Sequence, residues 1–401
     1  MSDSLAPPLS PRHPLWHVGF RPFFLLTCLS GLLLPSVWLL FLRGKLALPA
    51  FPAGLGAHPF AWHAPEMFFG FGLALLGGFL LTASKNWVNQ RGYHGTALQL
   101  LVAGWLLARW AMSGAVDTTG WPTPLWLAAV FAYPLLLVAL LWRTLWQHRA
   151  VDSFRKDNRY FLLLLPLLPV AEALLLSTEH FSAGVSMSVA LFRLAFLLML
   201  ERTLQPFMQG TFQVRLWRQP AADEAIRLLG AALIFAPWLP AAVSSLLAAA
   251  LGGLLLYRLA RWQPQLACRR LELAVMYVGL LCMALHLLLE AVSPWLALPQ
   301  VGAAAVHLFT LGLLGLIGPA MMVRISKGHT GRKVGFDRGD KAVLWLMLAA
   351  LICRVLLPQW LPALYSRWLD VAATGWLLGF AILLVRYAPY LWQARIDGKE
   401  H

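Results

Sequence analysis

Eight ionisable side chains lie inside long apolar stretches of this sequence, where a charge is costly and therefore indicates function. They are His63, Glu66, Arg109, Glu172, Arg193, His286, Glu290 and His307. Neutral imidazole is a common ligand of haem iron and of copper. His63, His286 and His307 fall at similar depths of their stretches, so they could share a cofactor. The alternative is that each histidine only hydrogen-bonds a neighbouring helix.

His63 opens a denser group, because Glu66 and Met67 follow at i+3 and i+4 and share one helix face. A structural interpretation is a well-started helix, with Pro65 in its first turn and Glu66 favouring the helix dipole. In a functional interpretation, His63, Glu66 and Met67 are metal ligands. Glu66 could also support the histidine or handle a proton. The residues leave these interpretations open.

Two basic groups could bind an anion: Arg21 and the loop 328–333. Arg21 stands at the start of an apolar stretch. The favoured interpretation is that its side chain extends to a lipid phosphate at the membrane surface. The alternative is that Arg21 binds a haem propionate. In the loop, His329, Thr330 and Arg332 offer donors among glycines, although the spacing is not that of a P-loop. A solvated loop would explain these charges but not the glycines.

The elements that must position these residues follow from the composition. Of 401 residues, 60% are hydrophobic and 12% are charged, whereas soluble domains are roughly 45–50% apolar and about 25% charged. This excludes a soluble globular protein and a disordered chain, and the long apolar runs disfavour a β-barrel. We predict an all-α polytopic bundle of about twelve transmembrane helices, as one domain over 22–390 with possible halves 22–210 and 225–390.

Two features qualify this set of spans. The weakest spans are 225–240 and 241–257, which little more than 237–240 separates, so they could form one bent hairpin. Two other spans resemble each other, since each begins near a histidine, His63 or His307, and continues through glycines. Small residues let helix backbones approach closely, and they could alternatively leave room for a ligand.

Basic residues indicate the orientation, because Lys and Arg gather in cytoplasmic loops. If the N-terminus is cytoplasmic, 26 of the 32 basic residues fall on that side. The tails 1–21 and 391–401 are then both cytoplasmic, and the net charge of +15 marks orientation and not nucleic-acid binding. The four cysteines predict neither a disulfide framework nor a metal site, and without a C-x-x-C-H motif any haem is non-covalent.

Several segments together resemble the NnrS family of bacterial inner-membrane proteins. They are GFRPFFLL (19–26), WHAPEMFFGF (62–71), GFLLTA (78–83), ERTLQPFMQG (201–210) and the stretch 307–332, which ends in GHTGR. The resemblance covers most of the chain and implies a multi-pass protein in the lipid bilayer of the inner membrane. It also implies haem b and copper, a link to denitrification and nitrosative stress, and nitric oxide or an iron-nitrosyl species as the partner.

One position departs from that family's pattern. The family motif usually has a second histidine where this chain has Pro65, which puts the copper in doubt. His63 and His307 remain as expected axial ligands, with His286 as a further candidate. A fainter likeness to the large subunit of haem-copper oxidases and nitric oxide reductases lies in the histidines of the second and tenth spans. The sixth and seventh spans lack those enzymes' copper-binding histidines, so a full oxidase or reductase centre is not expected.

Two functions of other classes remain open. A cofactor-free transporter would suit twelve spans in two halves. Arg109, Glu172, Arg193 and Glu290 would then mark a path for a substrate or for protons. An accessory scaffold of a haem-copper complex would instead bind a partner protein.

Overall fold

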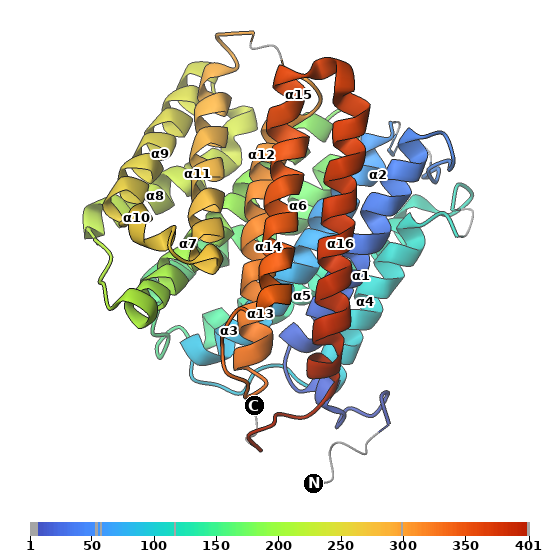
Figure 1. The fold of residues 1–401 in the computed structure, drawn as a ribbon. Coiled ribbons are helices and arrows are strands. Elements are labelled where there is room, and N and C mark those ends of the chain that lie inside the picture. Colours follow the sequence, from blue (N-terminus) through green and yellow to red (C-terminus); the bar gives the residue numbers. More distant parts are fainter. Residues whose placement is uncertain (1–6, 53–54, 57, 116–117, 298–299, 399–401) are drawn as a thin grey trace. The chain divides into compact units, whose positions relative to one another are not determined.

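The computed structural model describes residues 7–52, 55–56, 58–115, 118–297 and 300–398. Over these residues the chain is built from helices without a β-strand, and Leu55 and Ser177 form an isolated antiparallel bridge (Figure 1). The predicted all-α class is therefore confirmed. The first six residues of the expected amino-terminal tail and the last three of the carboxy-terminal tail lie outside the described residues.

Contacts divide the chain into two compact units. The first comprises Met1–Val185, Met322–Gly335 and Phe380–His401, and the second comprises Ser186–Met321 and Phe336–Gly379. These boundaries differ from the sequential halves 22–210 and 225–390, because segments from the end of the chain pack with its beginning. The ring of Phe380, for example, meets that of Phe71 edge-on, with 5.3 Å between the ring centres.

In the first unit, successive helices lead from the amino-terminal region to Leu176. They are α1 (Phe20–Leu42), α2 (Phe60–Pro65), a π-helix (Glu66–Gly72), α3 (Leu73–Trp87), α4 (Thr96–Met112), α5 (Thr123–Gln147) and α6 (Arg155–Leu176). The indole N–H groups of Trp62 and Trp126 donate to the carbonyls of Met112, 2.9 Å away, and Ala111, 3.2 Å away. The last carbonyls of a helix have no partner within it, so these bonds cap α4 and tie it to α2 and α5.

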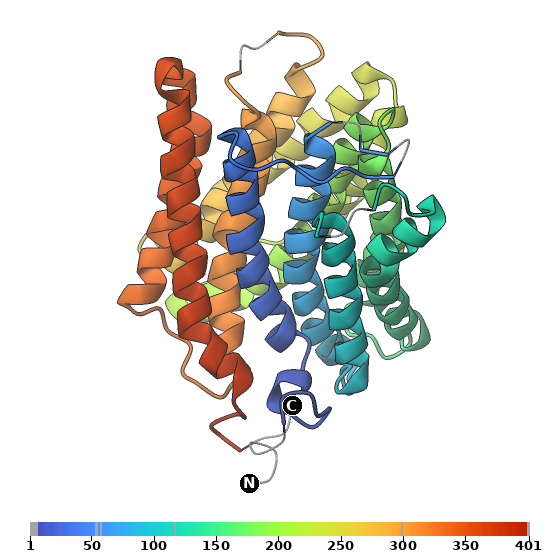
Figure 2. The same ribbon diagram turned by 90° about the vertical axis from the view of Figure 1, so that its right-hand side faces the viewer.

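The second unit contains most of the chain from α7 onward. Its elements are α7 (Phe181–Phe212), α8 (Pro220–Ala232), a 3₁₀ turn (Leu233–Trp238), α9 (Ala241–Arg261), α10 (Pro264–Ala267), α11 (Leu271–Val292), α12 (Ala304–Thr310), a π-helix (Leu311–Ile317), α13 (Gly318–Gly328), α14 (Arg338–Leu351), a π-helix (Ile352–Leu356), α15 (Leu357–Trp360), a 3₁₀ turn (Pro362–Leu364) and α16 (Tyr365–Trp392). The beginning of α7 and the ends of α13 and α16 belong to the first unit. Figure 2 shows the same helices from the side.

Ten helices of the described chain are long and apolar enough to cross a membrane, and Thr96–Met112 is a shorter apolar helix. The expected span 225–240 is not among them, because α8 ends at Ala232 and a 3₁₀ turn containing Pro237 follows. Proline cannot supply the N–H that a continuing α-helix needs. The helices are those of a multi-pass membrane protein, whereas twelve spans and the side of each terminus stay predictions.

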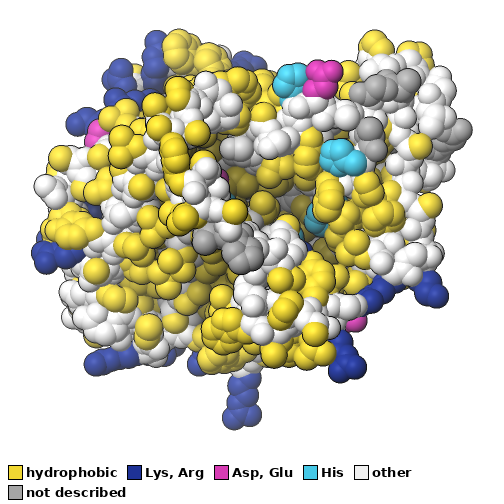
Figure 3. All heavy atoms as spheres, turned by 90° about the horizontal axis from the view of Figure 1, so that it is seen from above, with side chains coloured by type: hydrophobic (Ala, Val, Ile, Leu, Met, Phe, Trp, Pro, Cys, Tyr) yellow, Lys and Arg dark blue, Asp and Glu magenta, His cyan; other side chains and the backbone are white. Residues whose placement is uncertain are grey.

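The outward-facing side chains of many helices are apolar. Leu33, Leu246 and Val385 are 62%, 70% and 76% exposed. Figure 3 shows the molecule from above, where hydrophobic side chains are mixed with polar atoms and Lys and Arg side chains project at the edges. A soluble monomer rarely exposes large contiguous apolar patches. Lipid tails are apolar too, so a bilayer can surround this surface without that cost.

The histidines predicted as axial ligands share an unusual local structure. His63 lies in α2 and His307 in α12, and each of these short helices leads into a seven-residue π-helix, Glu66–Gly72 or Leu311–Ile317. π-helical turns are rare and occur frequently at functional sites. The similarity between the two spans, visible in the sequence as a histidine followed by glycines, therefore extends to the backbone.

Glycines let two helical segments of the second unit meet at the backbone. A Cβ on Gly279 of α11 would lie 2.7 Å from the carbonyl oxygen of Gly312. A Cβ on Gly312 would lie 2.4 Å from the Cβ of Cys282. The π-helix Leu311–Ile317 and α11 can pack this closely only because both positions lack a side chain. At Gly279 and Gly312 the structure supports packing as the reason for the glycine.

Gly312→Ala should lower the free energy of unfolding by about 1–3 kcal/mol, because an extra methyl group forces its neighbours to move. The matched control is Gly253→Ala in α9, where no atom lies within 4 Å of the added Cβ. Thermal unfolding of the detergent-solubilised variants measures the difference. Equal midpoints for the two variants would contradict the close approach of α11.

Candidate functional site

A buried ion pair in the first unit joins the π-helix Glu66–Gly72 to α4. Arg109 Nη1 lies 2.6 Å from Glu66 Oε2, and Glu66 is 1% exposed. A Cβ on Gly70 would lie 2.5 Å from that nitrogen and 2.8 Å from that oxygen. Charges taken out of water need such close pairing to be tolerated. Glycine at position 70 therefore makes the room that the ion pair requires.

Two hydrogen bonds hold α4 and α5 beside this pair. The indole N–H of Trp105 donates to the Gly70 carbonyl over 2.9 Å, and the Tyr133 hydroxyl donates to the Leu73 carbonyl over 3.0 Å. Both acceptors lie in or next to the π-helix that carries Glu66. The first bond therefore fixes α4, which carries the guanidinium of Arg109, and the second fixes α5 beside it.

A second carboxyl group, that of Glu172 in α6, belongs to the same site. Glu172 is fully buried, and the charges of Arg109 and Glu66 act on it. Within the described chain, neither of its side-chain oxygens has a hydrogen-bond partner. Three residues that the sequence placed on three separate spans thus form one group, the Glu66–Arg109–Glu172 cluster.

His63 and Met67 are neighbours of this cluster in the sequence and are both half-buried. The His63 ring stacks on Trp38 of α1, with 4.2 Å between the ring centres and 22° between the planes. The expected helix start is wrong, because α2 begins at Phe60 and Pro65 is its last residue. Proline lacks an N–H and crowds the preceding turn, so the regular helix stops there and the π-helix begins.

The second unit holds a triad of ionisable residues on α7 and α11. Arg193 Nη1 lies 2.7 Å from Glu290 Oε2, and His286 Nδ1 lies 3.6 Å from the same oxygen. The Arg193 and His286 side chains are buried, whereas the Glu290 side chain is 31% exposed. The Arg193–Glu290 pair joins α7 to α11, whereas His286 contacts a residue of its own helix, so these contacts do not show that His286 links helices. Its role as an axial ligand stays a prediction.

His307 stands on α12, which packs against α11 in the second unit. Its Nδ1 lies 2.7 Å from the carbonyl oxygen of Ala303, one turn earlier. Because a carbonyl can only accept, Nδ1 carries the proton and Nε2 carries the lone pair that a metal ion binds. Metal-ligating histidines commonly donate their other ring N–H in this way. Among the described residues, no group of three or more His, Cys, Asp or Glu side chains is gathered for a metal.

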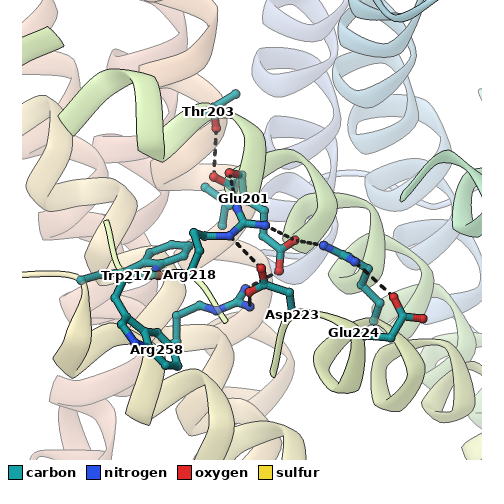
Figure 4. Close-up of polar contacts among 10 residues, drawn as sticks. Glu201, Thr203, Trp217, Arg218, Asp223, Glu224 and Arg258 are labelled. Atoms are coloured by element: carbon teal, nitrogen blue, oxygen red, sulfur yellow. Dashed lines mark hydrogen bonds and ion pairs between the residues drawn. The ribbon is translucent and has the colours of Figure 1, made fainter. Parts of the chain in front are cut away.

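A charged network in the second unit went unrecognised in the sequence (Figure 4). It consists of three arginines and three acids: Arg218, Arg227, Arg258, Glu201, Asp223 and Glu224. Glu201 of α7 pairs with Arg258 of α9, and over 3.0 Å with Arg227 of α8. Asp223 pairs with Arg218 over 2.8 Å and with Arg258 over 2.5 Å. Positive and negative charges are equal in number, so this network joins α7, α8 and α9 without a net charge. The acidic residues at the start of α8 were the one feature of the sequence that could have indicated it.

Arg258→Met should lower the free energy of unfolding by about 1–3 kcal/mol. Glu201 and Asp223 would each lose one of their cations, although Arg227 and Arg218 would remain beside them. Arg269→Met is the matched control, since Arg269 is exposed. Denaturant or thermal unfolding of the purified variants gives the difference. If both variants unfold alike, the network contributes nothing to stability.

Arg21 does not extend toward lipid, so the favoured interpretation of this residue is wrong. Arg21 is fully buried. Its Nη1 donates to the carbonyl of Leu391 over 3.0 Å and to that of Gln393 over 2.5 Å. These carbonyls, at the end of α16, lack partners within the helix. Arg21 therefore fastens the carboxy-terminal segment to α1, and its contact with a haem propionate stays a prediction.

The loop after α13 holds the same carboxy-terminal segment. Thr330 is fully buried, and its hydroxyl donates to a carbonyl one turn earlier over 2.6 Å. The Arg332 guanidinium lies 3.8 Å from the centre of the Tyr390 ring. The carbonyl of His329 accepts a hydrogen bond of 3.1 Å from Arg395. These contacts give the loop a structural role, and its binding of an anion stays a prediction.

His329 should stay neutral at physiological pH. Burial lowers its pKa to about 4, and the positive charges of Lys85, Arg395 and Arg21 act in the same direction. An unfolded histidine titrates near pH 6.5, so the unfolded chain binds more protons between pH 6.5 and pH 4. The free energy of unfolding should therefore fall as the pH drops through this range.

His329→Gln should flatten that pH dependence in unfolding curves recorded from pH 4 to pH 7. His94→Gln, at an exposed position, should leave it unchanged. A slope of unfolding free energy against pH that is the same in His329→Gln as in the wild type would contradict the buried, neutral ring.

The comparison with known protein families covers both units. Residues 14–395 match the family model described as NnrS protein, which is nearly the whole chain. No curated protein matches the chain. The matched range contains every helix described above and all the residues of the candidate sites.

Proposed function

This chain belongs to the NnrS family, and we propose that it is a haem-binding protein that acts in the response to nitric oxide. The proposed location is the bacterial inner membrane, which the long apolar helices support. The proposed setting is nitrosative stress associated with denitrification, with nitric oxide or an iron-nitrosyl species as the partner. The observation that carries the proposal is the hydrogen bond from His307 Nδ1 to the Ala303 carbonyl, because metal-ligating histidines commonly donate their other ring N–H to such a group.

Haem b needs one or two axial ligands in apolar surroundings. The proposed candidates are His307 in the second unit and His63 in the first, each taken within its own unit. The Ala303 carbonyl fixes the tautomer of His307, and the stack on Trp38 fixes the ring plane of His63. Bound haem would supply an iron that binds nitric oxide or passes electrons. In each unit the chain's own contribution is to orient one imidazole and to surround it with apolar helices.

Copper is not part of this proposal, because the residues expected to bind it do not fit. Pro65 stands where a second histidine was expected, and Glu66 is paired with Arg109. A protein copper site takes several imidazole, thiolate or thioether ligands, and within the described ranges no group of three or more candidate side chains is gathered.

His307→Ala should remove or strongly weaken the Soret band of the purified protein, since haem without its ligand binds less tightly. His63→Ala should weaken the same band. The matched control is His94→Ala, because the His94 ring also meets a backbone carbonyl, at 2.9 Å, but lies in an exposed loop outside the spans. Optical spectra after haem supplementation give the result. A wild-type protein without a Soret band would sink the proposal.

Cofactor-free transport is a second candidate function, which the buried charged groups favour. Intramembrane ionisable residues often mark ion or proton pathways, and the Glu66–Arg109 and Arg193–Glu290 pairs are of this kind. Uptake into liposomes by haem-free protein would support this candidate. Haem-dependent activity without any uptake would exclude it.

A further inference from the structure

Glu172 is a fully buried carboxyl group in a membrane helix, and the proposed haem site does not use it. The charged groups that act on it are Arg109 and Glu66. The elements packed against α6 are α5 and α2, whose buried or half-buried titratable residues are Tyr133 and His63. A carboxyl group in such a place is costly, so its protonation state needs a physical account.

The charges of the Glu66–Arg109–Glu172 cluster do not balance when both carboxyl groups are ionised. One guanidinium serves two carboxyl groups, and Arg109 already lies 2.6 Å from Glu66. A buried carboxylate without its own cation or donor costs several kcal/mol. Such a group binds a proton instead of remaining charged, and two interacting carboxyl groups titrate as a coupled pair.

Both Glu172 and Arg109 have side-chain atoms that could still form hydrogen bonds. Among the described residues, the oxygens of Glu172 and the Nε and Nη1 of Arg109 have no aligned hydrogen bond, although Nη1 lies against Glu66. The Arg109 side chain is 12% exposed, whereas that of Glu66 is 2% exposed. Arg109 is thus the member of the cluster that reaches the surface of the unit.

We propose that the Glu66–Arg109–Glu172 cluster is a proton-binding site within the membrane, in which Glu172 takes up and releases the proton. With Glu172 as a carboxylic acid, the cluster holds one carboxylate and one guanidinium and has no net charge. Release breaks the O–H bond of Glu172 and transfers the proton to a water molecule, which becomes hydronium. The electron pair stays on the Glu172 oxygen, and the cluster then has a charge of minus one. Arg109 then compensates two carboxylates. This inference does not depend on haem.

Infrared spectroscopy tests the proposal, because a carboxylic acid and a carboxylate absorb in separate regions. The full chain in lipid nanodiscs should show a carboxylic acid band at neutral pH. Glu172→Gln should remove that band, since the amide preserves the shape of the side chain but holds no titratable proton. Glu179→Gln is the matched control, because Glu179 is exposed just beyond the end of α6, and it should leave the band unchanged.

Two further measurements distinguish a proton-binding site from a sealed acid. Exchange into D₂O should shift the band to lower frequency, because the proton of Glu172 must be able to leave. Arg109→Gln should add a second carboxylic acid band, because Glu66 would lose its cation. The proposal is overturned if no band responds to Glu172→Gln or if the band resists deuteration. Neither result depends on the haem content of the sample.

Discussion

Charges placed inside an apolar helical bundle must be compensated by other parts of the chain, and the structure of both units depends on this constraint. In the first unit Arg109 lies against Glu66, and in the second Arg193 lies against Glu290. A buried charge without a partner costs several kcal/mol, and the partners come from different helices. These charges are therefore neutralised only when the helices that carry them are packed against each other.

Room for the charged groups comes from departures from regular helix. Gly70 stands in the π-helix Glu66–Gly72, and its missing side chain is what admits the ion pair. The corresponding π-helix of the second unit, Leu311–Ile317, uses Gly312 for a different purpose, the backbone approach of α11. The same sequence pattern, a histidine followed by glycines, thus serves electrostatics in one unit and packing in the other.

The residues that the sequence predicted to bind a cofactor, an anion or a proton fall into two groups according to their contacts. Arg21 and Arg332 contact Leu391 and Tyr390 and so hold the carboxy-terminal segment. The hydroxyl of Thr330 bonds to a carbonyl one turn earlier in the chain. The contacts of His307 and Glu172 do not involve the carboxy-terminal segment. His307 presents a ring nitrogen suited to a metal, and Glu172 is buried beside a cation that another carboxylate already engages.

The sequence alone determined the helical membrane class, because 60% hydrophobic residues in long runs admit little else. It also identified the family and the eight ionisable residues within apolar stretches, since both depend on local pattern. It did not place Pro65 at the end of α2, and it did not pair Arg109 with Glu66 or recognise the network around Arg258. Partners that lie far apart along the chain, such as Glu66 and Arg109 or Asp223 and Arg258, leave no periodic trace in a sequence. Only the tertiary structure decided them, because distance and burial determine which charges meet.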